Sequence, residues 1–235
     1  MTADHLAELN VPDRRGVKAA VRRGDGPFAT YAVSSYSPYL ALWAARRGLT
    51  PNAVTCMSLG AGVAAAAWFA GGDRAGMLTG AVLLYLAFAL SRVDGQLARA
   101  TGASTPLGAW LDAVCGVLRD AVVYAGLAVG SLAAPAGSPV HGGDVWPLAT
   151  AALALLVVRR TIGVSSATAA VPTGRRGPIM TAALLPDGER IALTCLAAAL
   201  TNARVTFTAL LIWGALATAA ALTLNIARPA REATR

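Results

Sequence analysis

Long apolar runs with almost no charged residues dominate this sequence. The longest cover about residues 52–70, 76–93, 107–134 and 205–226. Each is close to the roughly 20 residues that an α-helix needs to cross the hydrocarbon core of a bilayer. Charged residues make up 14% of the chain, whereas soluble domains contain roughly 25%. The runs therefore predict an all-α polytopic membrane protein and leave an Ala-rich soluble helical protein as the poorer alternative.

Two shorter apolar runs complete the predicted set of spans. They cover about residues 145–158 and 190–201. A less apolar connection, residues 159–186, separates them, and we expect it to be polar with helical ends. We therefore expect six transmembrane helices in total.

The segment before the first span has a different composition. Residues 1–27 are polar and basic, without the apolar stretch of a signal peptide. Residues 28–47 are rich in tyrosine and tryptophan, which favour the membrane–water interface. We expect an amphipathic helix lying on the bilayer, broken near Pro38, with an ordinary surface helix as the alternative. The predicted domains are residues 1–47, a basic arm and interfacial helix, and residues 48–235, a six-span membrane domain.

Basic residues are unevenly distributed between the two sides of the predicted spans. They gather in the N-terminal arm, the second-to-third and fourth-to-fifth loops and the C-terminal tail, whereas the alternate loops carry only Arg74 and Arg204. The positive-inside rule then predicts that both termini are cytoplasmic, and we expect the cytoplasmic (inner) membrane of a bacterium. The net charge of +8 comes from residues that flank apolar spans. It therefore favours membrane lipids as partners and excludes nucleic acid.

Polar residues with a regular spacing lie between the second and third spans. Asp94-Gly95 is followed by Ala98-Arg99, then by Gly108 and by Asp112. Carboxylates at membrane depth are costly and are kept mainly where they bind an ion or a polar substrate. This stretch is therefore the candidate functional site.

The spacing resembles the signature of the CDP-alcohol phosphatidyltransferase (CDP-alcohol phosphotransferase) family, Asp-x2-Asp-Gly-x2-Ala-Arg-x8-Gly-x3-Asp-x3-Asp. Residues 49–55, Leu-Thr-Pro-Asn-Ala-Val-Thr, resemble the family's entry into its first span. The resemblance implies a role in phospholipid biosynthesis. The expected reaction moves a phospho-alcohol (phosphatidyl) group from a CDP-linked donor to an acceptor alcohol and releases CMP.

The same resemblance implies roles for individual residues. Asp94 and Asp112 would bind Mg²⁺ or Mn²⁺, which prefer carboxylate oxygens. The expected nucleotide-contacting residues are Gly95, Ala98, Arg99 and Gly108, with Asn52 and Thr55 from the first span. A structural alternative is that Arg92 and Arg99 neutralise the two carboxylates.

Two of the four aspartates of the signature are absent. Ser91 stands at the first position and offers only a neutral hydroxyl, a poor metal ligand. Gly116 stands at the last position, which the family uses for the base that activates the acceptor hydroxyl. We therefore expect weakened metal binding and reduced or lost activity. Asp120, one turn beyond Gly116, is a further candidate base, and a buried ion pair with Arg119 is the alternative.

Several functional questions stay open at this point. One alternative is a non-catalytic pseudoenzyme that binds a CDP-lipid or a partner subunit. Another is a small membrane transporter with a polar path through Asp112, Arg119 and Asp120, although paired broken helices are missing. The family resemblance and the Ala/Gly-rich helix faces predict a homodimer. The acceptor alcohol is not specified, and Arg175 and Arg176 either bind a phosphate or mark the topology.

Overall fold

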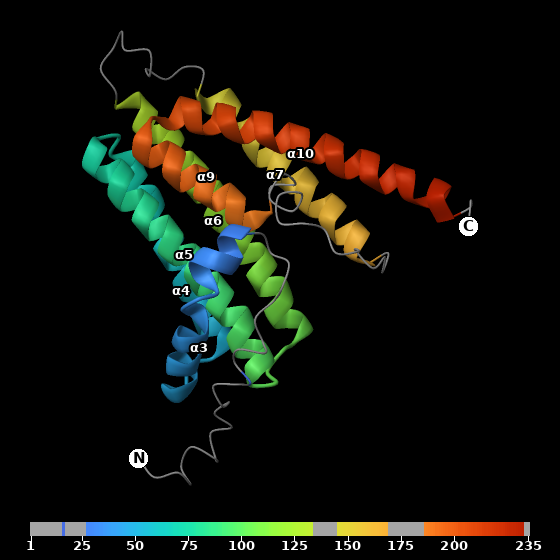
Figure 1. The fold of residues 1–235 in the computed structure, drawn as a ribbon. Helices are drawn as coiled ribbons and strands as arrows, with labels where there is room; N and C mark the ends of the chain where they lie inside the picture. The colour runs from blue at the N-terminus through green and yellow to red at the C-terminus, as the bar shows by residue number, and fades with distance from the viewer. Residues whose placement is uncertain (1–15, 17–26, 134–144, 169–185, 233–235) are drawn as a thin grey trace.

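The computed structural model describes residue 16 and residues 27–133, 145–168 and 186–232, and this part of the chain contains helices and no strand (Figure 1). Most of the basic arm lies outside the described residues, as do residues 134–144 and residues 169–185, which include Arg175 and Arg176. The described helices are η1 (Ala29–Val33, a π-helix), α3 (Ser37–Arg46), α4 (Pro51–Ala70), α5 (Arg74–Ala100), α6 (Pro106–Leu132), α7 (Val145–Thr168), α9 (Asp187–Leu200) and α10 (Ala203–Glu232).

Helices α4, α5 and α6 form the centre of the molecule, because α4 packs against both of the others. Glycines bring α4 and α6 together. A Cβ atom at Gly126 would overlap the backbone of Ala66, and one at Gly130 would overlap the carbonyl oxygen of Phe69. The two helices therefore contact each other through their backbones, as small residues allow in membranes.

Helices α9, α10 and α7 extend this centre on one side (Figure 1). Helix α9 packs against α5, and α10 packs against α9 and α7. Phe69, Leu84, Leu127, Ile191 and Phe207 are fully buried where these helices meet. The core thus joins the first spans of the chain to its last ones.

The region predicted as an interfacial helix is held on the central helices by polar contacts. The Tyr36 hydroxyl donates a hydrogen bond to the Tyr85 hydroxyl (2.7 Å), and Gln96 Nε2 donates one to Ser37 Oγ (2.8 Å). Burial raises the pKa of the Tyr36 phenol. The helical path is interrupted before Pro38, which lies in the first turn of α3, where proline is favoured. Tyr39, Leu40, Trp43 and Arg46 are exposed on α3, so the helix is amphipathic as predicted.

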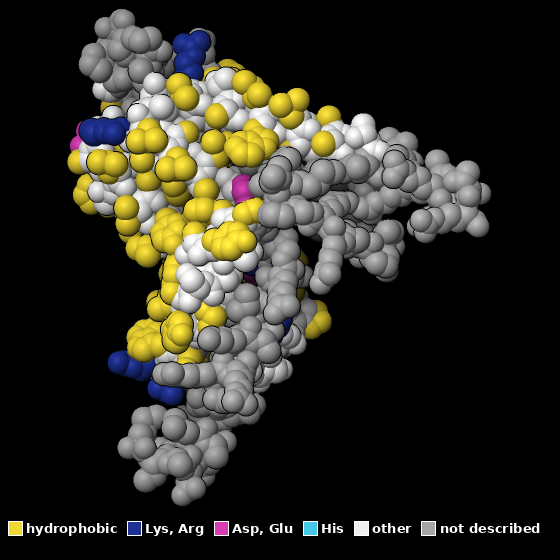
Figure 2. Space-filling view, viewed as in Figure 1, with side chains coloured by type: hydrophobic (Ala, Val, Ile, Leu, Met, Phe, Trp, Pro, Cys, Tyr) yellow, Lys and Arg dark blue, Asp and Glu magenta, His cyan; other side chains and the backbone are white. Residues whose placement is uncertain are grey.

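In the part of the chain that the structure describes, four helices are long and apolar enough to cross a membrane: Pro51–Ala70, Arg74–Ala100, Pro106–Leu132 and Ala203–Thr223. Hydrophobic side chains also cover much of the face seen in Figure 2, with basic side chains near its two ends. The prediction of an all-α multi-pass protein is confirmed. The number six stays a prediction, because α9 has 14 residues and is about 21 Å long, shorter than a core of about 30 Å.

The second predicted span was too short. It was expected to end near Val93, but α5 continues to Ala100. The polar residues of the motif interrupt the apolar pattern without interrupting the helix. Asp94 through Arg99 therefore lie on a continuous helix rather than in a loop.

Candidate functional site

Three helix ends meet at the motif, and local sequence signals determine where each begins or ends. Thr50 Oγ1 accepts a hydrogen bond from the Ala53 amide (3.2 Å), and Thr105 Oγ1 accepts one from the Gly108 amide (3.0 Å). Each threonine caps a helix that starts with proline, the residue favoured at the first helical position. Gly102, with φ of 69°, allows the turn between α5 and α6. The N-termini of α4 and α6 thus face the end of α5.

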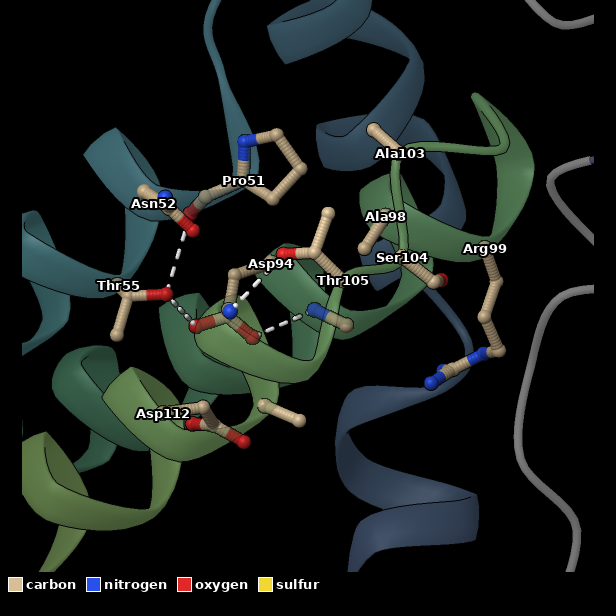
Figure 3. A pocket seen from close by; sticks show the side chains of 13 residues that line it. Pro51, Asn52, Thr55, Asp94, Ala98, Arg99, Ala103, Ser104, Thr105 and Asp112 are labelled. Atoms are coloured by element: carbon tan, nitrogen blue, oxygen red, sulfur yellow. Dashed lines mark hydrogen bonds between the residues drawn. The ribbon is translucent and has the colours of Figure 1, made fainter.

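A cavity of about 360 Å³ lies between these helix ends (Figure 3). Every residue predicted to contact a nucleotide lines it, together with both predicted metal ligands. The lining consists of Pro51, Asn52, Thr55, Asp94, Gly95, Ala98, Arg99, Ala103, Ser104, Thr105, Gly108, Ala109 and Asp112. The motif therefore forms one concave site with contributions from α4, α5 and α6.

The two carboxylates of the site differ in their surroundings. Asp94 is 3% exposed and accepts hydrogen bonds from Thr55 Oγ1 (2.7 Å) and from the Gly95 amide (2.5 Å). Asp112 is exposed to the cavity, and its Oδ1 accepts a hydrogen bond from Ser91 Oγ (3.4 Å). Ser91 of α5 and Asp112 of α6 therefore face each other.

Position 116 is covered by an arginine from another helix. A Cβ atom built on Gly116 would lie 3.0 Å from Arg160 Nη1 and 3.3 Å from Arg160 Nη2. The same guanidinium donates to the Ala113 carbonyl (3.2 Å) and to Asp120 Oδ2 (3.1 Å). A cationic group of α7 thus lies where the family's base would enter.

Asp120 is the centre of a buried charge cluster. It is 1% exposed and lies 2.8 Å from Arg190 Nη2, 3.1 Å from Arg160 Nη2 and 3.7 Å from Arg119 Nη2. The ion pair with Arg119 is the alternative raised from the sequence, and two further arginines join it. This geometry favours a structural role for Asp120, and its role as a base stays a prediction.

The two arginines suggested as neutralising partners have other neighbours as well. The Arg92 guanidinium carbon lies 6.0 Å from the centre of the Phe88 ring. The Arg99 guanidinium lies along Gly95, since a Cβ there would be 3.2 Å from Arg99 Nη1. In the view of Figure 3, Arg99 borders the cavity on the side away from Thr55. Their role as partners of Asp94 and Asp112 stays a hypothesis.

Comparison with known proteins adds a decisive observation. A family model described as CDP-alcohol phosphatidyltransferase matches residues 48–224. The chain belongs to this family.

Its curated relatives in the CDP-alcohol phosphatidyltransferase family match over a limited segment. A phosphatidylinositol phosphate synthase of Mycobacteroides abscessus is 39% identical over 83 residues, 35% of this chain and 36% of that protein. A bifunctional IPC transferase and DIPP synthase of Rubrobacter xylanophilus is 41% identical over 99 residues, 40% of this chain and 22% of that protein. The matched segments therefore span about a third or less of these relatives.

Solved structures of the phosphatidylinositol phosphate synthase of Mycobacterium tuberculosis share the fold. The one with CDP-DAG bound has a TM-score of 0.60 and 19% identity, covering 80% of this chain and 91% of that one. The complex with manganese and citrate has a TM-score of 0.56 and 21% identity, and the match covers 77% of this chain and 83% of that one. The predicted family fold is thus confirmed.

The site retains two of the four carboxylates that the family signature presents to divalent cations. Mg²⁺ is commonly held by one or two carboxylates together with substrate phosphates and water, and Asp94 and Asp112 meet that requirement. Within the ranges that the structure describes, no group of three or more His, Cys, Asp or Glu residues could hold a metal. The four-carboxylate arrangement of the family signature is therefore incomplete in this member.

Sequence reasoning missed the involvement of Arg160 and Arg190. Arg160 was placed in a polar connection, but it belongs to α7 and reaches α6. Arg190 was placed at the start of a span, but it is 4% exposed and bonds to Asp120 and to the Tyr124 hydroxyl. Their positions beside apolar runs were the available signal, because buried arginines require acidic or polar partners.

Proposed function

We propose that this protein is a CDP-alcohol phosphotransferase-like membrane protein of phospholipid biosynthesis that binds a CDP-linked donor with one divalent cation, and that transfer is slow or absent. The observation that carries the proposal is the placement of Asp94 and Asp112 in one cavity with all the predicted nucleotide-contacting residues. The two helix N-termini at its edge favour phosphate groups.

The protein groups of the cavity have distinct expected roles. Asp94 and Asp112 would hold Mg²⁺ or Mn²⁺, with the Ser91 hydroxyl as a poor third ligand, and a bound cation would offset the negative charge of the diphosphate. Gly95 and Gly108 leave room for the nucleotide to approach the backbone. Arg99 offers a permanent positive charge to a phosphate.

The reaction itself requires a group that this chain does not present at the family position. The acceptor hydroxyl oxygen would form a bond to the phosphorus that carries the lipid alcohol, and the bond from that phosphorus to CMP would break. The hydroxyl proton must pass to a base during the attack. Gly116 cannot accept it, and Asp120 is surrounded by three guanidinium groups. Slow or absent transfer follows, which keeps a non-catalytic CDP-lipid-binding protein as the second candidate.

The acceptor and the assembly state belong to the same proposal. The names of the matched relatives favour inositol phosphate as the first acceptor to test, with glycerol phosphate and serine beside it. We also propose a homodimer in the cytoplasmic membrane of a bacterium, with residues 48–235 as the membrane domain. A monomeric mass for the protein in lipid nanodiscs would contradict the dimer.

Binding and turnover should be measured separately on the full chain in nanodiscs. We expect CDP to bind more tightly in Mn²⁺ than in EDTA, and Asp94→Asn and Asp112→Asn to remove that difference. Asp73→Asn is a matched control, because Asp73 is an exposed helix cap at the other end of α5 and asparagine caps equally well. CMP release from CDP-diacylglycerol should stay near background with each acceptor.

Two outcomes would overturn the proposal. Absence of CDP binding in both Mn²⁺ and EDTA would exclude the binding function. Robust CMP release by the unmodified protein would exclude slow transfer. If that release were lost in Asp120→Asn, Asp120 would be the base.

A further inference from the structure

The guanidinium of Arg160 contacts one face of α6. It bridges Ala113 and Asp120 through hydrogen bonds of 3.2 and 3.1 Å, and Gly116 lies between these two residues on the same face. The absence of a side chain at Gly116 lets the guanidinium lie this close to the helix, since a Cβ there would be 3.0 Å from Nη1. Gly116 and Arg160 therefore form a matched pair, in which one residue leaves the space that the other fills.

The charge cluster is balanced only when Asp112 is counted with it. Arg119, Arg160 and Arg190 face the carboxylates of Asp120 and Asp187, and Arg119 and Arg160 also act electrostatically on Asp112. A divalent cation bound at Asp94 and Asp112 would offset the charge of Asp112 and leave three arginines facing two carboxylates. An uncompensated charge at this depth is costly, so such a cation favours an anionic ligand beside the cluster.

Arg160 is the member of the cluster that is best placed to meet such a ligand. Its side chain is 25% exposed, whereas those of Arg119 and Arg190 are 5% and 4% exposed. Arginine presents its donors in a planar fork that suits phosphate oxygens.

The cluster lies next to the nucleotide cavity. Asp112 lines the cavity and precedes Gly116 by one helical turn, about 5.4 Å along the axis. Arg160 is among the charges that act electrostatically on the Asp112 carboxylate. The fixed cation and the proposed ion site are therefore neighbours along one face of α6.

We propose that Arg160 replaces the second divalent ion of the site and holds the diphosphate of a CDP-linked ligand from the side of position 116. The inference rests on the proposed function, since it assumes that such a ligand enters the cavity. One ion at Asp94 and Asp112 and one guanidinium then share the charge of the diphosphate. A carboxylate introduced at position 116 would pair with Arg160 instead of binding metal, because its Cβ would already touch the guanidinium.

The first test is calorimetric titration of CDP into the full chain in nanodiscs, in EDTA, where only the protein's own cations act. Arg160→Gln should weaken CDP binding at least tenfold, and Arg160→Lys, which keeps the charge, by less. Arg159→Gln is the matched control. Arg159 donates to the Gly214 carbonyl (3.2 Å) and Thr218 Oγ1 (3.1 Å) on α10, so its loss should change CDP binding less than twofold.

The second test counts bound Mn²⁺ by electron paramagnetic resonance and does not depend on turnover or on the stability of Arg160→Gln. In the presence of CDP, the unmodified chain should bind one ion, and Ser91→Asp/Gly116→Asp should still bind one. Two ions in that double variant would overturn the inference, as would equal CDP affinities for Arg160→Gln and Arg159→Gln. If the unmodified chain binds no CDP with or without Mn²⁺, the proposed function itself fails.

Discussion

Thr55 and Asp94 join the start of α4 to the end of α5 through a hydrogen bond of 2.7 Å, donated by the threonine hydroxyl to Asp94 Oδ2. Both side chains are buried, with 4% and 3% of their surfaces exposed. The bond fixes the orientation of a carboxylate at the wall of the cavity. It also makes that carboxylate part of the contact between the two helices.

Replacing Thr55 by valine should therefore affect stability as well as ligand binding. Thr55→Val keeps the shape of the side chain but removes the hydroxyl donor of Asp94, which retains the hydrogen bond from the Gly95 amide. We expect the free energy of unfolding to fall by about 1–3 kcal/mol, the cost of an unsatisfied buried acceptor. Unfolding in mixed detergent micelles measures it. Thr55→Ser retains the hydroxyl, so its free energy of unfolding should be closer to that of the unmodified protein. Equal losses of stability in the two variants would show that the hydrogen bond to Asp94 does not stabilise the fold.

The backbone contact between α4 and α6 predicts a second difference. Gly126→Ala places a methyl group into the backbone of Ala66 and should lower the free energy of unfolding by about 1–3 kcal/mol or more. Gly60→Ala is the control, because nothing lies within 4 Å of its Cβ position. That change should be neutral or stabilise by up to about 1 kcal/mol, since alanine is the better helix former. Similar changes in the free energy of unfolding for the two variants would show that α4 and α6 are not in close backbone contact at Gly126.

The charge cluster predicts that two aspartates beside Arg190 differ in their importance. Asp120→Asn leaves three guanidinium groups without their shared carboxylate and should lower the free energy of unfolding by about 3–5 kcal/mol. Asp187 is 59% exposed and lies 3.5 Å from Arg190, so Asp187→Asn should cost at most about 1 kcal/mol. The same unfolding measurement compares them. A stable Asp120→Asn protein would mean that the cluster contributes little to the fold.

Restoring the carboxylates of the family signature at positions 91 and 116 should increase turnover. The sequence alone predicts that the double variant Ser91→Asp/Gly116→Asp turns over faster than either single variant. The two positions share metals and substrate, so their effects on turnover are not additive. Because Arg160 covers position 116, we expect the largest gain when Arg160→Gln is added. A regained base is worth about 10²–10⁴-fold, measured as CMP release from CDP-diacylglycerol. If the triple variant releases no more CMP than the double variant, Arg160 does not block the new carboxylate.

The predicted orientation can be tested at two described, exposed positions. Arg74 lies at the start of α5, and Ser104 lies in the turn after its end. After replacement of the native cysteines, Arg74→Cys should react with an impermeant thiol reagent added outside the cell, and Ser104→Cys should not. The reverse pattern would place both predicted cytoplasmic termini on the outer side of the membrane.

The sequence predicted the centre of the fold well because its signals are local. The boundaries expected for α4 and α6 differ from the observed ones by one or two residues, since proline and threonine define the starts and apolar runs define the lengths. The cavity was predictable for the same reason. Its residues come from adjacent helices at spacings that place them on common faces.

The charge cluster could not be predicted in the same way, because its partners are distant in the chain. Arg160 and Arg190 follow Asp120 by 40 and 70 positions. No periodicity connects such residues. They come together only because α7 packs against α6, and α9 packs against α5 and α10. The continuation of α5 to Ala100 was missed because hydropathy decreases at the motif, although the backbone remains helical there.

Four glycines of the described helices fall into two groups with different evolutionary constraints. Gly126 and Gly130 are confined by the α4 backbone, whereas Gly95 and Gly108 have only side-chain atoms near their Cβ positions, at 3.1–3.3 Å. A lineage that stopped using a nucleotide would be free to change the second group but not the first. Relatives in which residues 95 and 108 have changed, while Gly126 and Gly130 are kept, would therefore have lost ligand binding but not the fold.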